Sequence, residues 1–228
     1  MSPPQNDRTS SGRTRRRPIA RARRIAERLA ASYPGSATDL CALRHDTPYQ
    51  LLVATILSAQ CTDERVNQVV PALLARFPGP VEMAVANPEE VAALIRSTGF
   101  FRSKTSHLLG ASKALVDRHR GEVPTSMEEL TALPGVGRKT ANVVRSVAFG
   151  LPGLPVDTHV GRLSLRLRLT DSTDPVKVEH ELCGLLPDSE WGALSLRMIL
   201  HGRKVCIARR PRCEECELAD LCPSRRAG

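Results

Sequence analysis

The stretch LPGVGRKTANVV, residues 133–144, decides how the middle of this chain folds. It lies between two segments of helical periodicity, and Gly135 and Gly137 permit a tight hairpin around the apolar Val136. The second helix then begins with backbone amides that have no intrahelical acceptor, which is a typical site for a phosphate. An ordinary glycine helix cap would also place glycines here. The full string is much more specific than a lone Gly-x-Gly and favours a hairpin that binds an anion.

Outward from the hairpin, the chain shows helical patterns and no convincing strand. Apolar residues recur at steps of three and four from Ile19 onward, and Pro or Gly interrupts the pattern repeatedly. We expect helices at residues 19–32, 48–59, 63–76, 88–97, 103–120, 126–132, 138–149, 158–167, 175–186 and 190–201. Asn87-Pro88 is typical of a capped helix start, and Ser126 with Glu129 matches a capping box. The sequence therefore predicts an all-α protein.

Basic residues gather at both ends of the chain. The net charge is +9, and residues 1–24 hold eight Arg against one acidic residue. Residues 1–18 have almost nothing to bury and are expected to form a disordered basic tail. Basic ends favour a polyanion as partner, although a solvated arm would have the same composition. Only seven aromatic residues occur, too few for the stacking platforms of single-strand binders, so duplex DNA is the expected partner.

Targeting and membrane signals are weak. The longest apolar stretch, residues 51–57, is far shorter than the roughly 20 residues that span a bilayer. No apolar run follows the basic start, as a signal peptide would require. An Arg- and Ser-rich start also resembles an organelle transit peptide, but no amphipathic pattern accompanies it. We expect a cytoplasmic protein that does not bind membranes.

Four cysteines near the end of the chain form the most specific pattern. Cys206, Cys213, Cys216 and Cys222 are separated by six, two and five residues in a polar segment. Without a secretion signal, this spacing indicates a metal site rather than disulfides. Spacing alone leaves tetrahedral zinc and a cubane iron–sulfur cluster both open. The remaining cysteines are more simply core residues: Cys41, Cys61 and Cys183.

Taken together, these motifs resemble the endonuclease III family. LPGVGRKTANVV is similar to the helix-hairpin-helix of that family, and VDTHVGRL at 156–163 looks like the acidic loop that follows it. LLVATILSAQCTD at 51–63 and HGRKVCIARRPRCEECELADLC at 201–222 resemble two further family segments. The four motifs occur in the family's order and span about residues 19–224, which leaves only the Arg-rich tail unmatched.

The resemblance implies two helical domains that flank a DNA-binding cleft. A six-helix barrel with the helix-hairpin-helix would span residues 41–151, and a cluster domain would combine residues 19–40 and 152–228. The resemblance also favours a 4Fe-4S cluster on the four cysteines. The implied function is removal of oxidised pyrimidines from duplex DNA, followed by cleavage of the abasic site through a lysine Schiff base. We expect a monomeric, nucleoid-associated enzyme that acts on damaged or abasic duplexes.

Residue by residue, the resemblance assigns Lys139 as nucleophile and Asp157 as catalytic carboxylate. Position alone would instead indicate a solvated helix lysine and an aspartate helix cap. The resemblance implies that Gln60 fills the space facing the orphaned base and that Phe100 is an apolar wedge. Family members often have Leu at the position of Phe100 and Tyr at the next, which leaves lesion preference open. The residues assigned to DNA contact are Gln60, Asp63, Phe100, Gly135, Val136, Gly137, Arg138 and Thr140.

Two other functions fit part of the pattern. An adenine-mismatch glycosylase shares the hairpin and the cysteine spacing, but it lacks the nucleophilic lysine and has a carboxylate where this chain has Ala54. Such enzymes also carry a further C-terminal domain, whereas this chain ends six residues after Cys222. A non-catalytic DNA-binding module would retain hairpin and cluster. Intact Lys139 and Asp157 argue against it.

Overall fold

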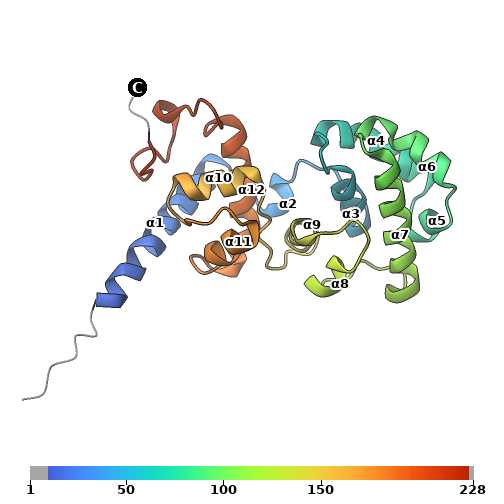
Figure 1. The fold of residues 1–228 in the computed structure, drawn as a ribbon, viewed down its shortest axis with the longest axis horizontal. Coiled ribbons are helices and arrows are strands. Elements are labelled where there is room, and N and C mark those ends of the chain that lie inside the picture. The colour runs from blue at the N-terminus through green and yellow to red at the C-terminus, as the bar shows by residue number, and fades with distance from the viewer. Residues whose placement is uncertain (1–9, 226–228) are drawn as a thin grey trace, which may run out of the picture. The chain divides into compact units, whose positions relative to one another are not determined.

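The computed structural model describes residues 10–225, with side chains from Ile19 onward. Every regular element in this range is a helix, and no strand occurs among the described residues (Figure 1). The predicted all-α fold class is confirmed. Of the predicted disordered tail, residues 1–9 and the side chains of residues 10–18 lie outside the described part. Within that part, no helix is long and apolar enough to cross a membrane.

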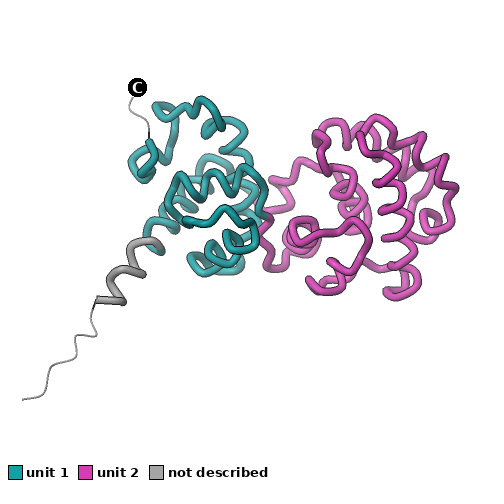
Figure 2. Tube along the Cα trace, in the orientation of Figure 1, with its two compact units in different colours: residues 1–35, 156–228 teal, residues 36–155 magenta. Residues whose placement is uncertain are grey.

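The chain divides into two compact units (Figure 2). Unit 2 is continuous and comprises residues 36–155. Unit 1 is discontinuous, because it combines residues 1–35 with residues 156–228. The candidate lysine belongs to unit 2, whereas the candidate aspartate and all four clustered cysteines belong to unit 1.

Unit 2 is built around one buried helix, α3. Its elements are α2 (Ala37–Leu40), α3 (Pro48–Leu57), α4 (Asp63–Arg76), α5 (Pro80–Ala84), α6 (Pro88–Ile95), η1 (Arg96–Thr98), α7 (Phe101–His119), α8 (Met127–Thr131), α9 (Arg138–Val143) and the π-helical η2 (Val144–Ala148). The apolar run Leu51–Leu57 gives α3 no polar face, so all of these residues are buried. Helices α4, α7, α9 and η2 pack around it. A helix that is hydrophobic all round is expected to be covered on all sides, as α3 is here.

Helix starts in unit 2 follow the sequence signals. The Asn87 side chain accepts a hydrogen bond from the Glu89 amide at 2.8 Å and caps α6, with Pro88 in the first turn. The Ser126 hydroxyl oxygen accepts from the Glu129 amide at 3.1 Å, as predicted. The Glu129 carboxylate, however, accepts from the Ser126 hydroxyl at 2.7 Å, which differs from a reciprocal backbone capping box.

Unit 1 brings together segments from both ends of the chain. Its elements are α1 (Ser10–Ser32), α10 (Thr158–Arg166), α11 (Pro175–Cys183), η3 (Asp188–Glu190), α12 (Trp191–Lys204) and η4 (Cys213–Glu215). Helix α12 packs against both α1 and α10. Arg28 of α1 pairs with Asp220, and Arg197 of α12 donates to the Tyr33 carbonyl at 3.0 Å. The first contact ties α1 to the cysteine-bearing segment, and the second ties the residue after α1 to α12.

Candidate active site and metal centre

The hairpin between α8 and α9 has a conformation that only glycine accommodates at its tip. Gly135 has φ of 77°, and a Cβ there would lie 2.6 Å from Cβ of His107. A Cβ on Gly110 would lie 3.1 Å from Cγ of Pro134, which shows how closely the hairpin packs on α7. The Val136 side chain is buried, so this residue offers a ligand only its backbone. Sequence and packing together fix the hairpin against α7.

Lys139 lies in the first turn of α9, immediately after this hairpin. Gly137 is the N-cap residue, and the Ala141 amide donates to its carbonyl at 2.9 Å, which begins the helix. The amides of the first turn have no acceptor within the helix. The Lys139 side chain is exposed, and those of Arg138 and Thr140 are half-buried. An exposed amine therefore stands beside backbone donors suited to a phosphate.

Asp157 is the N-cap of α10, as its position in the sequence suggests. Its Oδ1 accepts hydrogen bonds from the amides of His159 at 2.8 Å and Val160 at 2.9 Å. The side chain is half-buried, and Val156 beside it is buried. Capping is compatible with a catalytic role, because the two hydrogen bonds hold the carboxylate in one orientation at the start of the helix.

Gln60 and Phe100 are two exposed residues with unusual backbone conformations. Gln60 has φ of 52° and lies in the loop between α3 and α4, and Asp63 is the half-buried first residue of α4. Phe100 has φ of 46°, follows Gly99 with φ of 69°, and leaves 66% of its surface exposed. Positive φ is uncommon for residues other than glycine and is often found at functional sites. Both residues are thus presented to solvent on strained loops.

Lys104 is a buried residue of this region that no sequence motif indicates. It lies on α7 and is only 3% exposed, whereas lysine is almost never fully buried. Its Nζ donates to the Leu57 carbonyl at 2.7 Å and to the Thr98 carbonyl at 2.8 Å. Burial lowers its pKa, and a nearby Cys61 acts in the opposite direction. These backbone partners carry no sequence signature.

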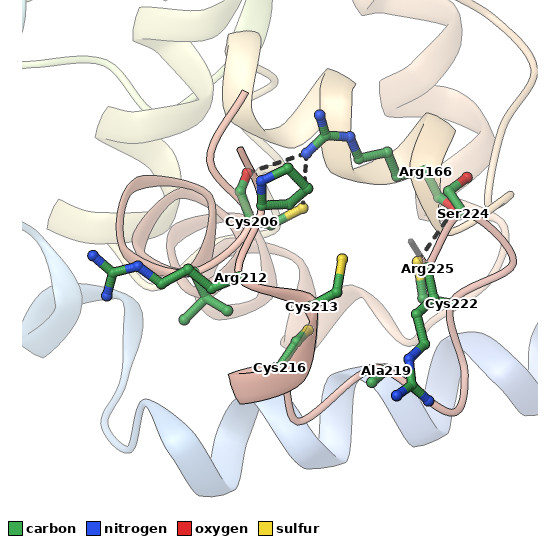
Figure 3. A pocket seen from close by; sticks show the side chains of 11 residues that line it. Arg166, Cys206, Arg212, Cys213, Cys216, Ala219, Cys222, Ser224 and Arg225 are labelled. Atoms are coloured by element: carbon green, nitrogen blue, oxygen red, sulfur yellow. Dashed lines mark hydrogen bonds between the residues drawn. The ribbon is translucent and has the colours of Figure 1, made fainter. Parts of the chain in front are cut away.

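The four clustered cysteines line one cavity in unit 1 (Figure 3). A water-sized sphere can occupy about 30 Å³ of it. Arg166 of α10 lies at its wall and donates to Sγ of Cys206 at 3.2 Å and to the Ile207 carbonyl at 3.0 Å. The Cys222 thiol donates to the Arg166 carbonyl at 3.7 Å. Helix α10 therefore holds both ends of the cysteine segment.

The donor set fits an iron–sulfur cubane better than a single zinc ion. Tetrahedral zinc with Zn–S bonds of about 2.3 Å would bring its sulfurs to about 3.8 Å from one another. Among the described residues, no three of the four cysteine sulfurs lie within 4.8 Å of each other. Burial raises the pKa of the Cys216 thiol to about 11 and also raises that of Cys222. A cationic centre is needed to hold such groups as thiolates.

A second group of metal-binding side chains lies beside one of these cysteines. The ligand atoms of His201, Cys216 and Glu217 all lie within 4.8 Å of one another. His201 is buried, its Nδ1 lies 3.2 Å from Glu217 Oε1, and burial lowers its pKa. The residues expected in the core are instead half-buried: Cys41, Cys61 and Cys183. None of these three lines the cavity.

Purified protein should contain iron and acid-labile sulfide in equal amounts, because four cysteine sulfurs that line one cavity suit a cubane. Elemental analysis and a sulfide assay measure this. Cys213→Ser should lower the iron content and the melting temperature, since metal binding contributes folding free energy to this polar segment. Cys183→Ser, which alters a cysteine of unit 1 outside the cavity, is the matched control and should retain iron. Stoichiometric zinc in place of iron would contradict the assignment.

Two family models match the chain. Residues 53–188 match an HhH-GPD superfamily base excision DNA repair protein, and residues 206–222 match the iron-sulfur binding domain of endonuclease III. The second match covers all four cysteines of the cavity, and the cofactor is a 4Fe-4S cluster.

Relatives and solved structures agree with these matches. Endonuclease III of Synechocystis sp. is 54% identical over 91% of this chain and 94% of its own length. Endonuclease III of Escherichia coli K12 is 39% identical over 87% of this chain and 92% of its own length. A trapped endonuclease III–DNA covalent intermediate superposes with a TM-score of 0.84 at 41% identity, covering 90% of this chain and 96% of that one. A thermostable thymine-DNA glycosylase shares the fold. It is 20% identical and superposes with a TM-score of 0.78, covering 93% of this chain and 98% of that one. The hairpin, the four-cysteine cavity and these similarities show that the chain belongs to the endonuclease III family.

Proposed function

We propose that Lys139 and Asp157 carry out the reaction of this base-excision repair enzyme, a DNA glycosylase with abasic-site lyase activity. The observation that carries the proposal is the exposed Lys139 amine in the first turn of α9, directly after the glycine hairpin. A phosphate bound by the first-turn amides would bring the neighbouring sugar within reach of this amine. The substrate is duplex DNA with an oxidised pyrimidine or an abasic site.

The chemistry follows from an amine at the anomeric carbon. The Lys139 Nζ attacks C1′, the bond from C1′ to the base breaks, and the base leaves with the bonding electrons and takes up a proton. Ring opening gives a Schiff base between Nζ and C1′. Loss of a proton from C2′ then expels the 3′ phosphate by β-elimination, and water releases the lysine. Asp157 accepts a proton during attack and stabilises the positive charge that develops on the sugar.

Gln60 and Phe100 give the enzyme access to the base. A glycosylase cannot reach its target atom inside a stacked duplex, so the nucleotide must leave the stack. We assign Gln60 to the space facing the orphaned base and Phe100 to the wedge, with Asp63 supporting the Gln60 loop. Their exposure and strained backbones support this assignment. We assign phosphate contact to the hairpin backbone around Gly135, Val136 and Gly137 and to the side chains of Arg138 and Thr140.

The cluster would be held by the four cysteines and supplies a rigid centre around which their segment folds. Exposed basic residues flank the first two of these cysteines in the sequence: Arg203, Lys204, Arg209, Arg210 and Arg212. Such side chains favour contact with DNA phosphates. We further propose that the enzyme acts as a monomer on nucleoid DNA in the cytoplasm, with residues 41–151 as the helical barrel and residues 19–40 and 152–228 as the cluster domain.

Four duplexes test the proposed substrate class. Wild-type protein should release base and cut the strand with thymine glycol, and should cut a preformed abasic site. Duplexes with uracil or with adenine opposite 8-oxoguanine should give little product. Gel assays with and without alkali separate base release from strand cleavage. Preference for adenine opposite 8-oxoguanine would support the mismatch glycosylase instead, although Ala54 is fully buried and supplies no carboxylate. Binding without any product would indicate a non-catalytic module.

A further inference from the structure

Lys104 connects the ends of two helices in unit 2. Leu57 is the last residue of α3, and Thr98 is the last residue of η1. The carbonyls at a helix C-terminus carry partial negative charge and have no partner within the helix. One buried ammonium donates to both of these carbonyls, at 2.7 Å and 2.8 Å. Lys104 thus caps both helices at once.

The segments that leave these two helix ends carry the two strained residues. Gln60 lies three positions after Leu57, and Phe100 lies two positions after Thr98. Both have left-handed backbones, with φ of 52° and 46°. The Thr98 hydroxyl also donates to the Ile95 carbonyl at 2.8 Å, which fixes the last turn before Gly99. A single side chain therefore sets where both loops begin.

We propose that Lys104 is a positioning residue that holds the Gln60 and Phe100 loops as one rigid pair for insertion into the duplex. This inference rests on the proposed function, in which these two residues occupy the space left by the flipped nucleotide. Inserting two side chains together requires a fixed separation between the loops. Loops ordered before binding lose less conformational entropy when they bind, so the bridge favours the flipped state.

A merely structural role for Lys104 would have different consequences. The hydroxyls of Tyr49 and Ser112 lie 2.9 Å apart and form another buried polar link between α3 and α7. This link lies away from the two loops in the sequence and serves as the matched comparison. Tyr49→Phe removes one buried hydrogen bond between the same helices and leaves both loops untouched. Loss of this hydrogen bond should lower the stability of the protein without selectively affecting insertion of Gln60 and Phe100 into the duplex.

The test compares Lys104→Met with Tyr49→Phe on three DNA probes. One duplex carries a non-cleavable abasic analogue opposite 2-aminopurine, whose fluorescence reports unstacking of the orphaned base. The second is a duplex with a natural abasic site. The third is single-stranded abasic DNA, on which cleavage needs no insertion against an opposite strand. Lys104→Met should reduce the fluorescence change and lower duplex kcat/KM by about ten- to a hundred-fold, as expected for lost charge-assisted hydrogen bonds.

The same variant should cleave single-stranded abasic DNA within a few-fold of wild type. In a Phe100→Ala background, Lys104→Met should lower the duplex kcat/KM by a much smaller factor than in wild type, because one member of the pair is already missing. Equal losses on duplex and single strand, or no loss on either, would overturn the proposal. If Lys104→Met does not fold, Lys104→Gln, which keeps an N–H donor, should show the same selective loss to a smaller extent.

Failure of this inference is distinguishable from failure of the proposed function. The fluorescence change on the non-cleavable analogue needs no chemistry, so it tests Lys104 even if another residue is the nucleophile. If wild-type protein cleaves neither abasic probe, the proposed lyase function is wrong, whereas a fluorescence change that depends on Lys104 would still support the positioning role.

Discussion

Lys139→Ala protein should yield no borohydride-trapped product with a thymine glycol duplex, because no amine remains at the start of α9 to form the Schiff base. Binding to a non-cleavable abasic analogue should stay within a few-fold of wild type, since the first-turn amides belong to the backbone and remain. Gel analysis of trapped complexes and fluorescence anisotropy measure the two properties separately.

A lysine of the same unit provides the control for this substitution. Lys113 is exposed on α7 and pairs with Asp117 at 3.2 Å, so Lys113→Ala removes one surface charge without altering the hairpin. This variant should trap as wild type does. Efficient trapping by Lys139→Ala would mean that another amine is the nucleophile, and the central assignment would be wrong.

Asp157→Asn should slow base release by about a hundred- to ten-thousand-fold, the range typical of general acid–base groups. Cleavage at preformed abasic sites should fall much less, because the Lys139 amine remains. The fold should persist, since asparagine is as good an N-cap as aspartate and can accept from the amides of His159 and Val160. Single-turnover assays on lesion and abasic duplexes measure the two rates.

Asp174→Asn is the matched control for the loss of charge at a helix cap. Asp174 caps α11 in the same unit and accepts from the Lys177 amide at 2.8 Å. The substitution removes the same charge from an equivalent position, and base release should stay near wild type. A comparable loss in both variants would assign the effect to helix capping or net charge, and Asp157 would lose its catalytic role.

Local signals explain how much of this fold was predictable. Capping by Asn87 and Ser126 depends on residues two or three positions apart, so sequence alone was sufficient. The hydrophobic periodicity found most of the longer helices, whereas α2 and α5 have only four and five residues, too few to show a period. The sequence showed the glycines of the hairpin. Glycine is required at position 135 because His107 lies too close for a Cβ, and this closeness depends on tertiary packing.

In the candidate site, too, local patterns were predictable from the sequence and tertiary contacts were not. The four cysteines are near one another in sequence, and their shared cavity followed from spacing. Lys104 was missed because one of its acceptors is a backbone carbonyl 47 positions away, and a carbonyl is present at every residue. His201 and Cys216 lie fifteen positions apart and meet only because α12 folds back on the cysteine segment. Contacts of this kind carry no periodicity or motif.

The discontinuous unit 1 has a consequence for the order in which the protein matures on the ribosome. Residues 36–155 emerge as a complete unit and can fold while synthesis continues. Helix α1 emerges first but must wait for Asp220, which lies 192 positions after its partner Arg28. The last of the four cysteines, Cys222, also follows the whole of residues 36–155, so a nascent protein would acquire its hairpin before all ligands of its metallocofactor are present.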